Sequence, residues 1–149
     1  MNTARVACDL DGVLIDSAEA LRRAYAGAGV LNWKPHTPWK MFATQEQHET
    51  KNRLYEDCLR SHGRLFPLAR IADEAEWDIV TGASDQAVSL VRNVFKLNLR
   101  FCYANVKSIE ERVELLKGLG TSVYIDDCEE NLKAIRKEIP RCQTFLTRP

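Results

Sequence analysis

The second half of the chain alternates short apolar strands with amphipathic helices, and this alternation constrains the fold more than any other feature. The pattern predicts, in chain order, strand 77–81, helix 85–96, strand 99–104, helix 109–117, strand 122–126, helix 129–138 and strand 142–146. Strands separated by helices pair in parallel, with the helices covering both faces of the sheet. A further strand at 4–9 makes five, so the sequence predicts a three-layer, Rossmann-like α/β fold with a parallel five-stranded sheet.

Capping residues mark the start of several predicted helices. Ser84 can cap the first helix of the alternating half, and Ser108 with Glu111 forms the S-x-x-E pattern of a capping box. Ser17 stands in the same position before a predicted helix at 18–28, so we expect its side chain to cap that helix.

A mainly helical segment of roughly sixty residues separates the first two strands, far more than a usual connection within a sheet. The apolar periodicity of this segment predicts three helices, at 18–28, 44–62 and 67–76. The stretch 30–43, which is rich in proline and aromatic residues, predicts a loop. We therefore expect a core formed by 1–14 and 77–149, with 15–76 as a small helical insertion packed over one end of the sheet.

Polar residues follow the predicted strands at the point where each strand ends. They are Asp9 and Asp11 after the first strand, Thr81 and Gly82 after the second, Lys107 after the third, and Asp126 with Asp127 at the end of the fourth. Ligands of open parallel sheets bind beyond the carboxyl ends of the strands, so we expect these residues to line one site.

Four carboxylates at one rim carry a charge that something must offset, because all would be ionised at neutral pH. A hard divalent cation with oxygen ligands does so, and Mg²⁺ suits a few carboxylates together with a substrate phosphate. The hydroxyl of Thr81 and the ammonium of Lys107 suit the other oxygens of a phosphoryl group. The pattern predicts a Mg²⁺-assisted phosphoryl-transfer site.

The first two aspartates have distinct predicted roles. Asp9 stands at the strand end, where a carboxylate screened by a metal is a competent nucleophile toward phosphorus. Asp11 lies two residues on, at the same side of an extended chain, and can exchange a proton with the leaving oxygen and with water. Gly12 lets the backbone turn away sharply after the strand.

These residues, in this order, resemble the haloacid dehalogenase superfamily. The matching motifs are DLDGVL at 9–14, VTG at 80–82, Lys107, and YIDDCEEN at 124–131. The resemblance covers essentially the whole chain, and it implies the fold of that superfamily and a small helical cap at 15–76.

The resemblance also implies a role for each site residue. It implies that Asp9 forms an aspartyl-phosphate and that Asp11 is the general acid and base. It implies that Mg²⁺ is held by the Asp9 carboxylate, the Asp11 backbone carbonyl and the acidic pair, with Asp127 as the better-placed ligand and Asp126 as its neighbour. The phosphoryl oxygens are then held by Thr81, the Gly82 amide and Lys107.

The chain departs from the superfamily pattern at two positions. Many relatives have a second acid four residues after the metal aspartate, where this chain has Asn131, which can still form hydrogen bonds or orient water. Many also place the lysine at the start of a K-x-x-x-L-x-x-L-G run, where this chain has Arg112. We favour Lys107 over Arg112 as the phosphate-binding cation, because Lys107 is nearer a strand end.

We therefore expect an enzyme that hydrolyses a small phosphomonoester, either a nucleotide or a sugar phosphate, through an aspartyl-phosphate. Trp33, Trp39 and Phe42 can either stack on a base or hold the cap together, which tilts the expectation slightly toward a nucleotidase. The alternatives are a phosphomutase of the same superfamily and a catalytically inactive binding module.

The amino-acid composition limits which binding partners and which cellular compartment we expect for this protein. Lys and Arg number 21 and Asp and Glu number 21, so there is no basic excess of the kind that broad nucleic-acid binding requires. No run of 18 apolar residues occurs, so no membrane span is expected. Five scattered cysteines without a C-x-x-C predict reduced thiols, and the N-terminus does not read as a secretory signal. We expect a cytoplasmic protein.

Overall fold

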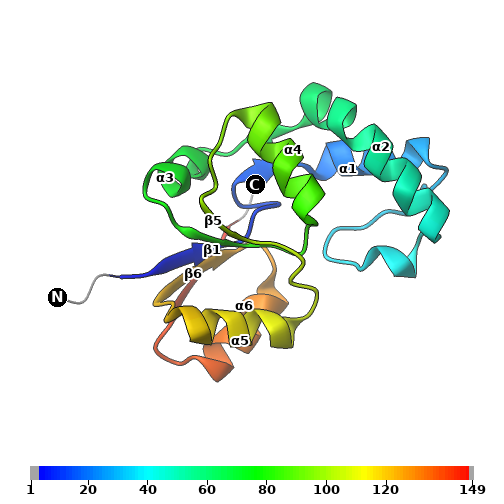
Figure 1. Ribbon diagram of the computed structural model, residues 1–149. Coiled ribbons are helices and arrows are strands. Elements are labelled where there is room, and N and C mark those ends of the chain that lie inside the picture. The colour runs from blue at the N-terminus through cyan, green and yellow to red at the C-terminus, as the bar shows by residue number, and fades with distance from the viewer. Residues whose placement is uncertain (1–3, 148–149) are drawn as a thin grey trace.

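The computed structural model describes residues 4–147 and contains the predicted sheet of five parallel strands (Figure 1). The strand order is β5-β4-β1-β6-β7. The strands are β1 (Val6–Cys8), β4 (Asp78–Val80), β5 (Phe101–Tyr103), β6 (Val123–Asp126) and β7 (Gln143–Leu146). All four neighbouring pairs are parallel, so the predicted α/β fold class is confirmed.

Helices cover both faces of the sheet, which gives the predicted three layers (Figure 1). One face carries α3 (Leu68–Glu74) and α4 (Asp85–Phe95), and the other carries α5 (Ile109–Leu119) and α6 (Glu129–Glu138). Neighbouring strand residues point to opposite faces, so Cys8 packs with the first pair of helices and Ala7 with the second. Each face thus has its own buried hydrophobic cluster.

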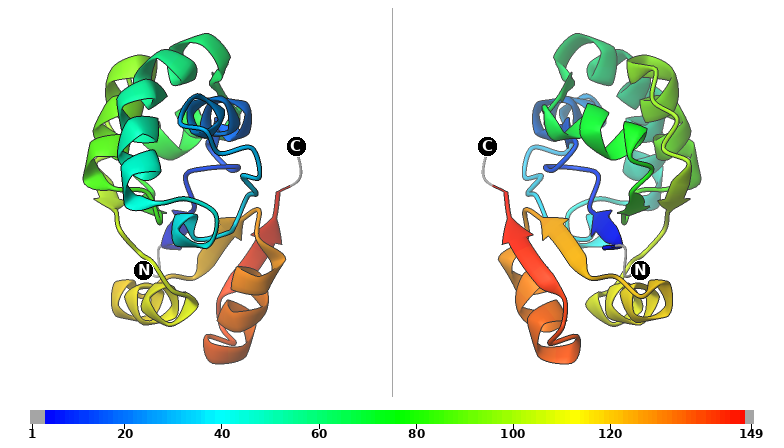
Figure 2. Two further views of the ribbon diagram at one scale, coloured as in Figure 1. Left: turned by 90° about the vertical axis from the view of Figure 1, so that its right-hand side faces the viewer. Right: turned by 90° about the vertical axis from the view of Figure 1, so that its left-hand side faces the viewer.

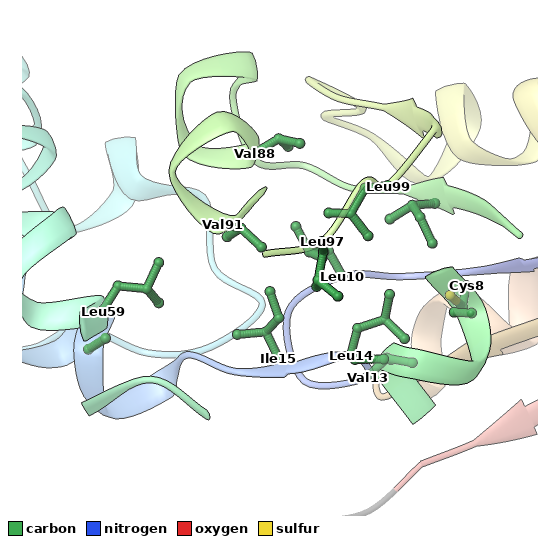
Figure 3. Packing of buried hydrophobic residues seen from close by; sticks show 14 of the residues in the cluster. Cys8, Leu10, Val13, Leu14, Ile15, Leu59, Val88, Val91, Leu97 and Leu99 are labelled. Carbon is green, nitrogen blue, oxygen red and sulfur yellow. The ribbon is translucent and has the colours of Figure 1, made fainter. Parts of the chain in front are cut away.

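The cluster beneath α4 includes the residues that follow β1. Figure 3 shows Leu10, Val13, Leu14 and Ile15 packed among side chains of α4 and of the segment after it, including Val91. The chain after the first strand is therefore held by apolar burial immediately beside the acidic residues Asp9 and Asp11.

The segment between β1 and β4 is mainly helical, as predicted. It holds α1 (Ala18–Gly27), the short 3₁₀ helix η1 (Trp39–Met41), α2 (Gln45–His62) and α3. The sequence patterns missed a small antiparallel ribbon, β2 (Ile15–Asp16) with β3 (Arg64–Leu65), because two-residue strands carry no measurable period.

Helices α1 and α2 pack against each other beyond the end of the sheet toward which β1 points (Figures 1 and 2). Several of their buried side chains, among them Ala24, Tyr55 and Leu59, belong to the same hydrophobic cluster as Cys8 of β1. Burial is therefore continuous across residue 15, and the division into a core and a separate cap stays a prediction.

Two of the three predicted serine caps are confirmed. The Ser84 and Ser108 hydroxyls accept hydrogen bonds from the backbone N–H groups of Ala87 and Glu111. The prediction for Ser17 is wrong, because its side chain makes no cap hydrogen bond. The backbone of Ser17 is at φ −107° and ψ −1°, not in the extended conformation of the capping residues Ser84 and Ser108. Its hydroxyl donates to the Asp11 carboxylate at 2.5 Å.

The cysteines and the helices bear on the compositional predictions. All five cysteines are free thiols, in agreement with the expectation of reduced cysteines. Within residues 4–147, none of the helices has the length and apolarity that crossing a bilayer requires.

Candidate active site

Two strand ends, those of β1 and β6, bring acidic side chains together at one edge of the sheet. Asp9 follows β1, and its backbone N–H donates to the Ile125 carbonyl of β6 at 3.0 Å, so the pairing continues to the site. Asp126 is the last residue of β6 and Asp127 follows it. One carboxylate oxygen from each of Asp9, Asp126 and Asp127 lies within 4.8 Å of the other two. The expected acidic cluster is therefore present.

The Asp9 carboxylate is buried and lies close to another negative charge. Its Oδ1 accepts a hydrogen bond from the Leu10 backbone N–H at 2.8 Å. Burial, and then the neighbouring Asp126 charge, raise the pKa of Asp9 well above that of an ordinary aspartate. A bound cation would reverse this effect and keep Asp9 ionised at neutral pH.

Asp126 is fully buried, and hydrogen bonds occupy both of its oxygens. Oδ2 accepts from the Tyr124 hydroxyl at 2.6 Å and from the Asn131 amide at 2.9 Å. Oδ1 accepts from the Cys128 backbone N–H at 3.0 Å. Asn131 therefore orients an acid of the cluster, and Asp126 has little capacity left to bind a metal.

Asp127 has the opposite character. Its Oδ1 is buried and has no hydrogen-bond partner among residues 4–147, and His36 Nε2 lies 3.4 Å from its Oδ2. The carboxylate lies against Gly12, where an added Cβ would come within 2.0 Å of Asp127 Oδ2. An orphaned buried oxygen beside two further carboxylates is the donor set that suits a hard cation such as Mg²⁺.

Asp11 lies on the side of the site that faces α1 and α2. It accepts the short hydrogen bond from Ser17, which is itself buried. Burial raises the pKa of Asp11, while the Ser17 hydrogen bond and the Lys51 charge lower it. The balance is upward, which favours a carboxyl group that carries a proton closer to neutral pH than an exposed aspartate does.

The predicted phosphate-binding residues follow β4 and β5. Thr81 is buried, its hydroxyl accepts from the Ala83 N–H at 3.1 Å, and the Val106 N–H donates to its carbonyl. The Lys107 ammonium donates to the Gly82 carbonyl at 2.6 Å, so these two residues are in direct contact. The three predicted residues thus form one wall next to the acidic cluster.

Arg112 is the second candidate cation, and it lies inside the site. It comes from the first turn of α5 and is buried. Its Nη1 donates to the Val80 carbonyl and to the Tyr124 hydroxyl, at 3.1 and 2.6 Å. The same nitrogen lies 4.0 Å from Asp9 Oδ1 and 3.9 Å from Asp126 Oδ2. Burial opposes the charged form, but Asp9, Tyr124 and Asp126 raise the pKa of Arg112 overall.

The sequence patterns missed four residues at this site, namely Ser17, His36, Lys51 and Tyr124. Lys51 is buried on α2 and carried a usable signal, because it shares the helix face of Tyr55 and Leu59 at helical spacing. A lysine on an apolar stripe is unusual. His36 carried no such signal, since it lies in a loop.

The aromatic residues of the 30–43 stretch are largely engaged within the protein. The Trp39 ring stacks on His48 with centroids 4.0 Å apart, and Phe42 packs edge-on against Tyr25 at 5.1 Å. Of the two readings left open by the sequence, this packing favours holding the helices together over stacking on a base.

Comparison with known proteins shows that the chain shares its fold with solved structures but has low sequence identity to them. No family model matches the chain, and no curated protein matches it. Among solved structures, CbbY from Rhodobacter sphaeroides in complex with phosphate matches with a TM-score of 0.66 at 17% identity, over 99% of this chain and 88% of that one.

Two further structures match over nearly the whole chain. A HAD-superfamily hydrolase of subfamily IA from Geobacter sulfurreducens has a TM-score of 0.59 at 16% identity, covering 97% of this chain and 89% of that one. A hydrolase from Pseudomonas syringae has a TM-score of 0.62 at 17% identity, covering 96% and 83%. The fold of this chain is that of the haloacid dehalogenase-like hydrolases.

Proposed function

We propose that the protein is a Mg²⁺-dependent phosphatase that hydrolyses a small phosphomonoester through an aspartyl-phosphate on Asp9. The observation that carries this proposal is the cluster of Asp9, Asp126 and Asp127 carboxylates within 4.8 Å at the carboxyl ends of β1 and β6. Such a cluster of like charges costs folding free energy, and a phosphoryl-transfer site gives it a use.

The residues that would hold the metal are Asp9, Asp127 and the Asp11 backbone carbonyl, with Asp126 in support. The free Oδ1 of Asp127 supports its role as a ligand, and the three hydrogen bonds to Asp126 support an orienting role. When bound there, Mg²⁺ supplies positive charge that offsets the carboxylate and phosphoryl oxygens.

The chemistry divides between two carboxyl groups. An Asp9 oxygen attacks phosphorus, and the bond from phosphorus to the leaving oxygen breaks as Asp11 gives that oxygen its proton. Asp11 then accepts a proton from water, whose oxygen attacks the acyl phosphate and releases inorganic phosphate and free Asp9. The raised pKa of Asp11 supports its role as the proton donor in the first step.

The wall next to the acidic cluster is proposed to hold the phosphoryl group. Thr81, the Gly82 amide and Lys107 are proposed to bind its oxygens, and CbbY, a protein of the same fold, was solved with phosphate bound. We assign Arg112 to the buried side of the site, where it neutralises and positions Asp9 and Asp126.

We also propose that residues 15–76 act as a cap. Helices α1 and α2 lie beyond the end of β1, and His36 from the loop between them reaches Asp127. A cap in this place would exclude water during phosphoryl transfer and would admit the substrate when it moves away.

Release of inorganic phosphate from a panel of phosphomonoesters, with Mg²⁺ and with EDTA, tests the function. We expect release by the wild type with Mg²⁺ alone, and none by Asp9→Asn, which keeps the shape of residue 9 and removes its nucleophile. Equal turnover by Asp9→Asn, or full activity in EDTA, would contradict the proposal.

A further inference from the structure

Lys51 is a buried cation that has no acidic partner. Only 7% of the residue is exposed, and its ammonium donates one hydrogen bond, to the Asn52 side-chain carbonyl at 3.2 Å. The ammonium also lies over the rings of Tyr25 and Tyr55, 5.3 and 4.9 Å from their centroids. Within residues 4–147, no carboxylate oxygen comes within 4.0 Å of it.

This arrangement costs folding free energy. Burial lowers the pKa of Lys51 to about 8, and a neutral amide oxygen with two aromatic faces recovers only part of the lost hydration. A leucine or methionine would fill the same place on α2 without that cost. The lysine therefore has no evident use in packing, and its charge needs another partner.

The position of Lys51 indicates where that partner would come from. The charges of Asp11 and Lys107 both act on Lys51, the first raising its pKa and the second lowering it. The geometry agrees, because the Lys51 ammonium lies over the ring of Tyr55, and Tyr55 adjoins Ser17, whose hydroxyl donates to Asp11. Lys51 therefore lies on the side of the site where Asp11 meets α1 and α2. Since Asp11 is proposed to protonate the leaving oxygen, Lys51 faces the leaving group rather than the transferred phosphoryl group.

His48, which precedes Lys51 by one helical turn, does not supply a second charge. Burial, followed by the Lys51 and Lys107 ammonium groups, lowers the pKa of His48, so its imidazole is neutral near pH 7. Its ring is fixed between Trp39 and the Tyr25 hydroxyl, which lies 3.0 Å from Nδ1. Tyr25, which contacts His48, is also one of the two rings beneath the Lys51 ammonium.

We propose that Lys51 binds a negatively charged group on the leaving group, so that the substrates are phosphomonoesters that bear a second acidic group. That group is a carboxylate or a second phosphate, since both present anionic oxygens to an ammonium. The inference rests on the proposed phosphatase function and narrows its substrate class. It also runs against the nucleotidase expectation, because a nucleoside leaving group is uncharged.

Matched substrate pairs test the inference. In the first pair, 3-phosphoglycerate carries a carboxylate where glycerol 3-phosphate carries an alcohol. In the second pair, fructose 1,6-bisphosphate carries a second phosphate that fructose 6-phosphate lacks. We expect the wild type to have the higher kcat/KM for the acidic member of at least one pair. The pair with the larger preference says which acidic group the site takes.

Variants connect that preference to Lys51. Lys51→Met is expected to lower the ratio of kcat/KM for the acidic over the neutral member by about 10- to 100-fold, the usual effect of losing a charged hydrogen bond. Lys40→Met is the matched control, because Lys40 lies in the same segment, over the Trp39 ring, but is exposed, and it should leave the ratio unchanged. Lys51→Gln is the second variant if the first fails to fold.

A binding measurement separates failure of this inference from failure of the phosphatase. Thermal shifts with each pair member and Mg²⁺, in the Asp9→Asn background with and without Lys51→Met, report binding without turnover. No hydrolysis but a Lys51-dependent preference in binding would overturn the phosphatase and support the anion site. Hydrolysis without a preference, or with one that survives both Lys51 substitutions, would overturn the anion site alone. Absence of both hydrolysis and preference would overturn both.

Discussion

The Arg112 guanidinium lies 4.0 Å from the Asp9 carboxylate, whereas the Lys107 ammonium is hydrogen-bonded to the Gly82 carbonyl. The two cations are therefore divided between the two sides of the site. Arg112 is buried beneath the acidic cluster, and Lys107 is exposed at the strand end, where the phosphoryl group is proposed to bind.

Substitution of each cation by methionine should separate their roles. Arg112→Met leaves Asp9 and Asp126 buried without a counter-charge, so we expect a loss of activity together with a loss of stability on the order of 3–5 kcal/mol. Lys107→Met removes an exposed charge, so activity should fall while stability changes by less than about 0.5 kcal/mol. Phosphate release and urea unfolding measure the two effects.

The assignment fails in an identifiable way. If Lys107→Met keeps full activity and Arg112→Met remains stably folded but inactive, then Arg112 alone binds the phosphoryl group.

The two aspartates at the end of β6 should respond differently to amide substitution. Asp127→Asn weakens a proposed metal ligand that makes no buried hydrogen bond through Oδ1, so the rise in melting temperature on adding Mg²⁺ should shrink or vanish. Asp126→Asn disturbs three hydrogen bonds, so it should destabilise the protein by about 1–3 kcal/mol even in EDTA. Equal Mg²⁺ responses in wild type and Asp127→Asn would exclude Asp127 as a ligand.

Gly12→Ala should damage the site through backbone and side-chain effects together. Residue 12 has φ +82°, and a Cβ there would meet Asp127 Oδ2 at 2.0 Å. We expect a loss of stability of at least about 1–2 kcal/mol from the left-handed backbone alone, and weaker Mg²⁺ binding as Asp127 is displaced. Thermal unfolding with and without Mg²⁺ measures both.

Gly118→Ala provides the matched control for that experiment. An added Cβ at residue 118 meets nothing within 4 Å, and the residue lies within α5. Alanine there should stabilise the protein by about 0.5–1 kcal/mol and leave Mg²⁺ binding unchanged. If both alanine variants have the same stability and the same Mg²⁺ binding, the close approach of Gly12 to Asp127 is not needed for metal binding.

The stability difference between Lys51→Met and wild type should depend on pH. The pKa of Lys51 in the folded protein is about 8, below that of an exposed lysine near 10.4. Between these values the unfolded chain binds a proton that the folded protein has lost, so the lysine's cost to stability falls as pH rises. Lys51→Met should therefore be the more stable protein below pH 8, by about 3 kcal/mol at most, and its advantage should shrink toward pH 10.

Chemical unfolding of both proteins from pH 7 to 9.5 measures this difference. The cysteine thiols of the unfolded chain titrate in the same range, whereas burial raises the pKa of each cysteine in the folded protein. This contribution is common to both proteins and cancels. The tyrosines facing Lys51 stay protonated there, since burial raises the pKa of Tyr25 to about 12 and that of Tyr55 further. A Lys51→Met protein that is less stable than wild type at every pH would show that Lys51 has a structural role.

The sheet and the acidic cluster could be predicted from the sequence because both depend on local pattern. Alternating strands and helices fix the parallel pairing, and polar residues at strand ends then share an edge whatever the details of packing. Asp9, Asp126 and Asp127 met as expected for this reason.

Other features depend on tertiary contacts that no local pattern reports. The Ser17 hydroxyl donates to the carboxylate of Asp11, six residues earlier, and makes no helix-cap hydrogen bond. The Arg112 side chain reaches the site because Val80 and Tyr124 accept its hydrogen bonds. The His36 contact with Asp127 depends on the path of a loop. Nearness to a strand end favoured Lys107, whose role as the phosphate-binding cation stays a prediction, and it could not reveal that Arg112 of α5 lies 4.0 Å from Asp9.

The central position of β1 bears on how the protein is made. This strand leaves the ribosome first, yet its two partners are β4 and β6, and β6 begins only at Val123. One edge of β1 therefore stays unpaired until β4 is made, and the other stays unpaired until β6 is made. An unpaired strand edge is prone to mispairing, and such mispairing is slow to resolve. A nascent chain interrupted before β6 would hold Asp9 without Asp126 or Asp127, so the acidic cluster can form only after β6 has been synthesised.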